Sequence, residues 1–217
     1  MRPLRIAAAL GLVLFAVITS AQSAELIPVT VDEPAGAQLV ERLRGGGLVL
    51  FFRHADTAGM PCDRSFRVGD RKGQRNISAA GQQQSRRIGE AMTKLAIPLA
   101  EPILAGPVFR ARDTAELAFG TARVQVTDSL LADDYAGGRL QWVLAEHRRL
   151  FNDAPVAKSN RVLVGHRTPA IMVLGESVGR KAFPEGAALV LEPGRERPQV
   201  VGILMFAPIP GGGFHSC

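Results

Sequence analysis

The sequence predicts an α/β protein, a three-layer α/β/α sandwich with a mostly parallel central sheet. Short apolar runs with strand character recur along the chain, at residues 48–52, 102–106, 123–126, 161–166, 187–192 and 200–206. Helical patterns of about 10 to 15 residues lie between several of these runs. Several of these runs, such as residues 48–52 and 200–206, are continuously apolar, which is typical of strands covered by helices on both faces.

Two helices are visible as apolar stripes. The clearer one covers residues 140–151, and its apolar face consists of Leu140, Val143, Leu144, His147, Leu150 and Phe151. His147 belongs to this stripe, so we expect it to be a core or boundary residue. The second stripe covers residues 88–95 and is preceded by two candidate N-caps, Asn76 and Ser78.

Residues 1–24 are predicted to be a secretory signal that does not belong to the fold. Two arginines form a basic start, residues 6–18 are an uncharged run of 13, and small residues follow. A retained membrane anchor is the alternative, but 13 residues are short of the roughly 20 that a spanning helix needs. We therefore expect residues 25–217 to form one domain in the periplasm or outside the cell.

The charge of the chain indicates its partners. The formal net charge of +6 falls to +4 without residues 1–24, which contain two arginines and no acid. This mild basicity favours anionic small molecules or phosphorylated surface lipids over nucleic acid, and it allows membrane-surface association without a spanning segment. Residues 62–75 hold five basic side chains, and this loop either faces a substrate or is simply solvated.

The chain contains two cysteines, Cys62 and Cys217. After export both would meet an oxidising compartment, in which disulfides form. A bridge between them would connect the glycine-rich C-terminal tail to the loop that follows His54. In the chain-entropy model, closing a loop of that size stabilises a fold by about 5 kcal/mol.

Charged residues follow two of the predicted strands directly. Arg53 and His54 come at the end of the run 48–52, and His166 follows the run "RVLVG" in the same way. Ligands of α/β sheets bind beyond the carboxyl ends of the strands. We therefore expect the two histidines to meet at one edge of the sheet.

Four segments with recognisable motifs follow one another along the chain: "FFRHA", "NISAAGQQQSRRIG", "AGPVFRARDTAELAFG" and "VLVGHRTPAI". Together they resemble the histidine phosphatase superfamily, and the resemblance extends from residue 48 to about residue 170. The chain looks like a member of the smaller branch that contains phosphoglycerate mutases and assorted phosphatases. It lacks the Arg-His-Gly-x-Arg-x-Pro signature of the acid phosphatases and phytases.

The resemblance implies a role for each matching residue. His54 corresponds to the nucleophile that accepts the phosphoryl group, Arg53 and Arg110 to phosphate-binding arginines, and His166 to the second histidine. The Arg-Ala-x-x-Thr-Ala frame favours Arg110 over its neighbour Arg112.

These residue types suit the chemistry of a phosphate monoester. A neutral imidazole is a nucleophile that the anionic ester does not repel. Guanidinium groups are permanently charged and bind two oxygens at once, which stabilises charge on the transferring phosphoryl group. No two of the four histidines are spaced at i, i+3 or i, i+4, so we expect no metal site, and the reaction needs no cofactor. His215, in the tail, receives no role.

The sequence offers more than one candidate for the general acid. Family members carry a glutamate in a Leu-x-Glu segment, where this chain has Asp133, followed by Asp134, in "LLADDYAGG". Asp133 is our candidate proton donor. The alternative is that either aspartate is a turn residue capping the helix that begins near Arg139, and Glu185 in "FPEG" is the second candidate acid.

Three consecutive residues, Gln74, Arg75 and Asn76, are further candidates for the pocket. Arg75 and Asn76 are predicted to bind substrate. Helix capping is the alternative for Asn76, and a solvated surface position is the alternative for the other two. Gly106 departs from the family, which usually has serine before the proline of this segment.

Taken together, the sequence predicts a phosphatase that hydrolyses phosphomonoesters through a phosphohistidine. Its substrate would be a small-molecule or lipid-linked phosphoester of the envelope, or one that is scavenged, by analogy with lipopolysaccharide core phosphatases. The alternative is a noncatalytic protein that binds phosphate or a phosphoglycan. Such a protein would need the arginines but no nucleophile.

Overall fold

The computed structural model describes residues 26–179 and 182–215. Seven strands form one sheet in the order β1-β7-β6-β2-β5-β3-β4. Their bounds are β1 Val29–Thr30, β2 Val49–Arg53, β3 Ile103–Ala105, β4 Val124–Val126, β5 Arg161–Gly165, β6 Ala187–Glu192 and β7 Gln199–Met205. Four of the six pairings are parallel, and only those of β6 with β2 and β7 are antiparallel.

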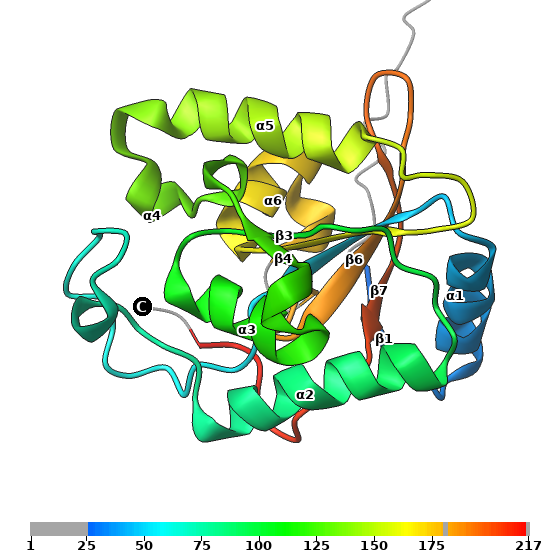
Figure 1. Cartoon of the computed structure of the whole chain (residues 1–217), viewed down its shortest axis with the longest axis horizontal. Helices are drawn as coiled ribbons and strands as arrows, with labels where there is room; N and C mark the ends of the chain where they lie inside the picture. Colours follow the sequence, from blue (N-terminus) through cyan, green and yellow to red (C-terminus); the bar gives the residue numbers. More distant parts are fainter. Residues whose placement is uncertain (1–25, 180–181, 216–217) are drawn as a thin grey trace, which may run out of the picture.

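Helices cover both faces of this sheet, so the predicted three-layer sandwich is confirmed (Figure 1). The helices are α1 Pro34–Gly45, α2 Ala79–Lys94, α3 Phe109–Phe119, α4 Asp133–Ala136, α5 Leu140–Asn152 and α6 Arg167–Leu174. Short 3-10 turns are η1 Arg71–Gly73, η2 Thr121–Arg123, η3 Asp128–Leu130, η4 Gly137–Arg139 and η5 Glu176–Val178. Helices α5 and α6 lie on one face, and α1, α2 and α3 lie on the other.

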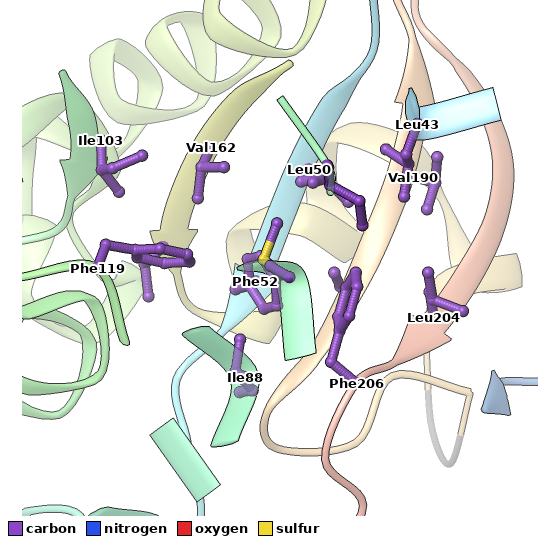
Figure 2. Close-up of a cluster of buried hydrophobic side chains, with 14 of the residues drawn as sticks. Leu43, Leu50, Phe52, Ile88, Ile103, Phe119, Val162, Val190, Leu204 and Phe206 are labelled. Carbon is purple, nitrogen blue, oxygen red and sulfur yellow. The ribbon is translucent and has the colours of Figure 1, made fainter. Parts of the chain in front are cut away.

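The alternation of side chains along β2 explains why both faces are apolar. Leu50 and Phe52 belong to the core under α1, α2 and α3, part of which is drawn in Figure 2. Val49 and Phe51 point into the second core, under α5 and α6. Every residue of β2 is buried, and an apolar strand of this kind holds whatever follows it rigidly in place.

The predicted elements compare closely with the observed ones. All six apolar runs form strands, and the stripe at 140–151 forms α5, with His147 fully buried in its apolar face. Between the two candidate N-caps of α2, the structure selects Ser78, whose Oγ accepts a hydrogen bond from Gly81 N. The two-residue strand β1 was not predicted.

The antiparallel strand β6 has a consequence for the site. Because β6 runs against β2, the residues that precede β6 lie at the carboxyl end of β2. Gly186 N donates a hydrogen bond to His54 O, which ties the two segments together. Phe183 and Glu185 are thereby brought beside Arg53.

Two predictions concern residues that the structure does not describe. The signal at residues 1–24 lies outside the described residues, and none of the described helices is long and apolar enough to cross a membrane. Cys62 is disulfide-bonded. Cys217, which the sequence offers as its partner, also lies outside the described residues.

Candidate active site

The two histidines predicted to meet do so at the carboxyl edge of the sheet. Arg53 is the last residue of β2 and pairs in register with Gly165, the last residue of β5. His54 and His166 therefore leave the sheet side by side, with 5.4 Å between their ring centroids. The two side chains come from positions 112 residues apart, and the parallel pairing of β2 with β5 brings them together.

Arg110 reaches the same place from α3. Strand β3 pairs with β5, and Arg110 lies in the first turn of the helix that follows it, with an exposed fraction of 5 %. Gly106 lies between the strand and the helix. A Cβ at Gly106 would be 2.3 Å from Leu130 O, so the backbone leaves no room there for the serine expected by resemblance.

These side chains enclose a cavity of about 330 Å³. It is lined by Arg53, His54, Cys62, Asp63, Phe66, Arg75, Arg110, Ala132, Asp133, Asp134, His166, Arg167, Thr168 and His215. A larger hollow of about 850 Å³ lies between α2 and α3, but no histidine lines it. The chemistry of the lining, and not the volume, identifies the smaller cavity as the candidate site.

The hydrogen bonds of His54 determine its tautomer. Nδ1 lies 2.9 Å from Ala55 O, and since a carbonyl oxygen only accepts, Nδ1 carries the proton. The loop is held in turn by Ala55 N, which donates to Thr114 Oγ1. Nε2 of His54 is therefore left with its lone pair, which is the form required of a nucleophile.

Both histidines are kept neutral by their surroundings. Burial, followed by the nearby charges of Arg110 and Arg53, holds the pKa of His54 well below its ordinary value. The pKa of His166 is lowered well below its ordinary value by burial and by Arg110. At neutral pH, His54 can thus act as a nucleophile without first losing a proton.

Three buried polar atoms of this site have no hydrogen-bond partner among the described residues: Arg53 Nε, Arg110 Nε and His166 Nε2. An unpaired buried N–H costs about 1–3 kcal/mol, so such groups need an explanation. All three residues line one cavity. The oxygens of a phosphate would satisfy them together.

Asp133 lines this cavity, at the N-terminus of α4. Burial, reinforced by the neighbouring Asp134, raises the pKa of Asp133 above its ordinary value. A carboxyl group of this kind keeps its proton to higher pH than an exposed one, as a general acid must. Both aspartates begin the short helix α4, and neither caps the helix that follows Arg139, because the N-cap of α5 is Arg139 itself and no side chain provides a capping hydrogen bond there.

The remaining candidates differ in whether they line the cavity. Arg75 lines the cavity, and burial, followed by the charge of Arg110, lowers its pKa. Asn76 does not line the cavity, because its amide nitrogen donates to Arg71 O and Gln74 O within its own loop. The structure therefore does not bring Asn76 together with the other candidate site residues, and substrate binding by Asn76 stays a prediction. Glu185, the second candidate acid, lies behind Arg53 and binds it as an ion pair.

Sequence reasoning missed two residues of the site. Asp63 binds Arg110, with Oδ2 at 3.0 Å from Nη1, and Oδ1 accepts from Arg75 N. His215, to which the sequence assigned nothing, also lines the cavity. One signal could have located both. A bridge between Cys62 and Cys217, as the sequence predicts, would bring the neighbours of each cysteine toward the loop that follows His54.

Comparison with solved structures places this fold among known ones. The structure of the protein histidine phosphatase SixA with tungstate matches with a TM-score of 0.52 and 17 % identity, covering 73 % of this chain and 97 % of that one. A mycobacterial glucosyl-3-phosphoglycerate phosphatase with inorganic phosphate matches with a TM-score of 0.50 and 18 % identity, covering 76 % and 100 %. A putative α-ribazole-5'-P phosphatase from Escherichia coli K-12 matches with a TM-score of 0.50 and 13 % identity, covering 75 % of this chain and 98 % of that one.

No protein-family model matches the sequence, and no curated protein matches it either. The structural likeness shows that the chain has the fold of the histidine phosphatases, which confirms at the level of fold the resemblance seen in four short segments. At these low identities the fold is shared, and the activity must be argued from the site.

Proposed function

We propose that the protein is a phosphatase that hydrolyses phosphomonoesters through a phosphohistidine on His54. The observation that carries this proposal is the neutral His54 with its Nε2 lone pair, set in one cavity with Arg53 and Arg110. Proteins of the same fold include one determined with tungstate and one with inorganic phosphate. Phosphate and tungstate are both oxyanions, and arginine side chains such as those of this cavity bind such oxygens well.

In the first step, Nε2 of His54 attacks phosphorus, and the bond from phosphorus to the ester oxygen breaks. Negative charge spreads over the equatorial oxygens, and Arg53 and Arg110 stabilise it. His54 is held in line by rigid β2 on one side and by its Nδ1 hydrogen bond on the other. Such positioning matters because a small displacement of the nucleophile is costly.

The leaving oxygen needs a proton, and the proposed donor is Asp133, which lines the cavity. Its raised pKa favours the protonated form that the step requires. In the second step, water attacks the phosphohistidine, the bond from phosphorus to nitrogen breaks, and the Asp133 carboxylate takes up the proton of the water. Inorganic phosphate leaves, and both His54 and Asp133 return to their starting states.

We further propose that the substrate is a lipid-linked phosphoester of the cell envelope. The loop beside the cavity exposes three apolar side chains, Met60, Phe66 and Val68, and two cationic ones, Arg64 and Arg67. Apolar and basic groups together suit an anionic lipid surface. Phe66 also lines the cavity, so the same loop would contact the substrate beyond its phosphate.

The location proposed for this activity is the periplasm or the medium, since residues 1–24 read as a secretory signal. N-terminal sequencing of protein secreted from cells that express the whole gene checks this. We expect the mature chain to begin within residues 22–25. A mature protein that retains residue 1 would contradict export by cleavage.

A noncatalytic phosphate-binding protein is the competing function. It would use Arg53 and Arg110, but it has no use for a histidine held in the nucleophilic tautomer. The two functions differ in whether phosphate becomes attached to the protein.

The experiment measures hydrolysis of p-nitrophenyl phosphate and of a lipid phosphate, together with trapping of acid-labile, alkali-stable phosphate on the protein. We expect His54→Ala to abolish both activity and labelling. Arg110→Ala should lower kcat/KM by about 10² to 10³. Arg112→Ala is the matched control, because Arg112 lies two residues away and pairs with Glu116 at the surface.

Wild-type protein that binds phosphate but neither hydrolyses any of a panel of phosphoesters nor becomes labelled would establish the noncatalytic function instead. Faster hydrolysis of a soluble sugar phosphate than of the lipid phosphate would reject the envelope substrate and leave the phosphatase in place.

A further inference from the structure

The C-terminal tail returns to the active site and binds it through its backbone. Figure 1 shows the red tail running back to the loop that follows β2. Gly213 O accepts from Glu185 N at 2.8 Å and from Arg53 Nη1 at 3.3 Å. His215 O accepts from Arg53 Nη2 at 3.4 Å. The His215 ring packs against Gly59, where a Cβ would come within 2.9 Å of it. The tail thus forms one wall of the site.

These contacts determine which nitrogen of the Arg53 guanidinium is available to bind a ligand. Nη1 donates to Phe183 O and Gly213 O, and Nη2 donates to Glu185 Oε1 and His215 O. Both terminal nitrogens are therefore bound within the protein. Nε is buried and has no partner among the described residues, so it is the nitrogen that remains to bind phosphate.

Glu185 connects the tail to this arginine. Its side chain is completely buried, and Oε1 accepts from Arg53 Nη2 at 3.1 Å and from Thr57 Oγ1 at 3.0 Å. Oε2 lies 2.9 Å from Nδ1 of His215, and because a carboxylate only accepts, Nδ1 is the donor. The His215 ring thereby holds Glu185, and Glu185 holds Arg53.

We propose that His215 is a positioning residue of the proposed phosphatase, acting through Glu185 to hold Arg53 with its Nε toward the phosphate. The inference deepens the proposed function and rests on it for the identity of the anion. His215 lines the cavity, and with Nδ1 bound to Glu185 its Nε2 is the ring nitrogen available to the group that carries the phosphate. The tail residue thus contributes both to phosphate affinity and to substrate selection.

A metal centre is the competing explanation, since ligand atoms of Asp56, Glu185 and His215 lie within 4.8 Å of one another. The bonds already made argue against it. Both oxygens of Glu185 accept from protein donors, and Asp56 Oδ2 accepts from Ser78 Oγ and Ala58 N. Arg53 supplies the cation that a metal would otherwise provide.

The test is the dissociation constant of inorganic phosphate, measured by calorimetry on the full chain as exported, with kcat and KM measured in parallel. We expect His215→Ala to weaken phosphate binding about tenfold and to raise KM by a similar factor, because one hydrogen bond to a charged group is lost. His215→Asn places an amide N–H where Nδ1 was and should recover most of that loss. Phe214→Ala is the control, because Phe214 is the neighbour of His215 in the sequence and its own side chain is exposed and does not line the cavity.

Calorimetry measures phosphate binding whether or not the protein hydrolyses an ester, so it tests the role of His215 separately from the phosphatase activity. Wild type that binds phosphate without hydrolysing any ester rejects the phosphatase, while the effect of His215→Ala still decides the positioning role. Equal phosphate affinity in wild type and His215→Ala would overturn the positioning role. A loss of phosphate affinity in His215→Asn as large as that in His215→Ala would overturn it as well. A rise in affinity on adding Zn²⁺ to wild type would favour the metal centre and overturn it too.

Discussion

Asp63 and Arg110 form an ion pair inside the active-site cavity, with 3.0 Å between Oδ2 and Nη1. The side chains are largely buried, with exposed fractions of 11 % and 6 %. One of the two arginines proposed to bind phosphate is therefore engaged by a carboxylate before any substrate arrives. A phosphate that binds Arg110 must either displace Asp63 or share the guanidinium with it.

A mutation of Asp63 can remove the competition between its carboxylate and the substrate phosphate for Arg110. Asp63→Asn eliminates the negative charge beside the phosphate, and we expect KM for an aryl phosphate to fall about fivefold, since even an exposed ion pair is worth up to about 1 kcal/mol. Steady-state kinetics measure the change. Asp128→Asn is the control, because Asp128 pairs with Arg139 at the surface. A higher KM in Asp63→Asn would show that Asp63 serves to orient Arg110.

The role of Asp133 predicts a dependence on the leaving group. Asp133→Asn removes the proton donor, so kcat/KM for an alkyl phosphate should fall by about 10² to 10⁴. An aryl phosphate with an acidic phenol leaves without help and should lose far less. The alkaline limb of the wild-type pH profile for the alkyl ester should also disappear. Equal losses for both esters would assign the proton transfer to another group.

His147 should make stability depend on pH. Burial lowers its pKa to about 4, while an unfolded histidine has a pKa of about 6.5, so the unfolded chain binds the extra proton between these values. Stability therefore rises with pH across this window and is lost as the pH falls from about 6.5 toward 4. The contribution is roughly 3 kcal/mol.

Urea unfolding at several pH values between 4 and 7 measures this effect. His147→Leu keeps an apolar side chain in the stripe of α5, and we expect it to flatten the pH dependence of the free energy of unfolding. The buried histidines of the site, His54 and His166, add to the slope in the same direction and remain in the variant. An unchanged slope in His147→Leu would contradict the assignment.

Gly106 is expected to tolerate no side chain. Its Cβ would meet Leu130 O at 2.3 Å, so Gly106→Ala must push the backbone of η3 away and should cost about 2 kcal/mol. Thermal unfolding reports the loss. Gly45→Ala, at the end of α1 where nothing lies within 4 Å, is the control and should change stability little. A variant Gly106→Ala as stable as wild type would show that η3 can move freely.

Much of the architecture could be predicted because its causes are local. Apolar runs such as residues 48–52 and 161–165 are typical of strands that are buried on both faces, and the period of the stripe at residues 140–151 is enough to predict a helix. Because Arg53 and His54 come directly after such a run, their position at the carboxyl edge of the sheet could be predicted as well. The position of Asn76 outside the cavity has a local cause too, because its amide binds the backbone of its own loop.

The sequence by itself determined six of the seven strands, the identity of the groups at their ends, and the expectation that His54 and His166 meet. Only the tertiary structure decided what surrounds them. Glu185 reaches Arg53 across 132 positions because β6 runs antiparallel to β2, and His215 O reaches it across 162 because the tail folds back. Such contacts depend on strand register and chain path, and these arise from the packing of the whole core and not from the spacing of neighbouring residues.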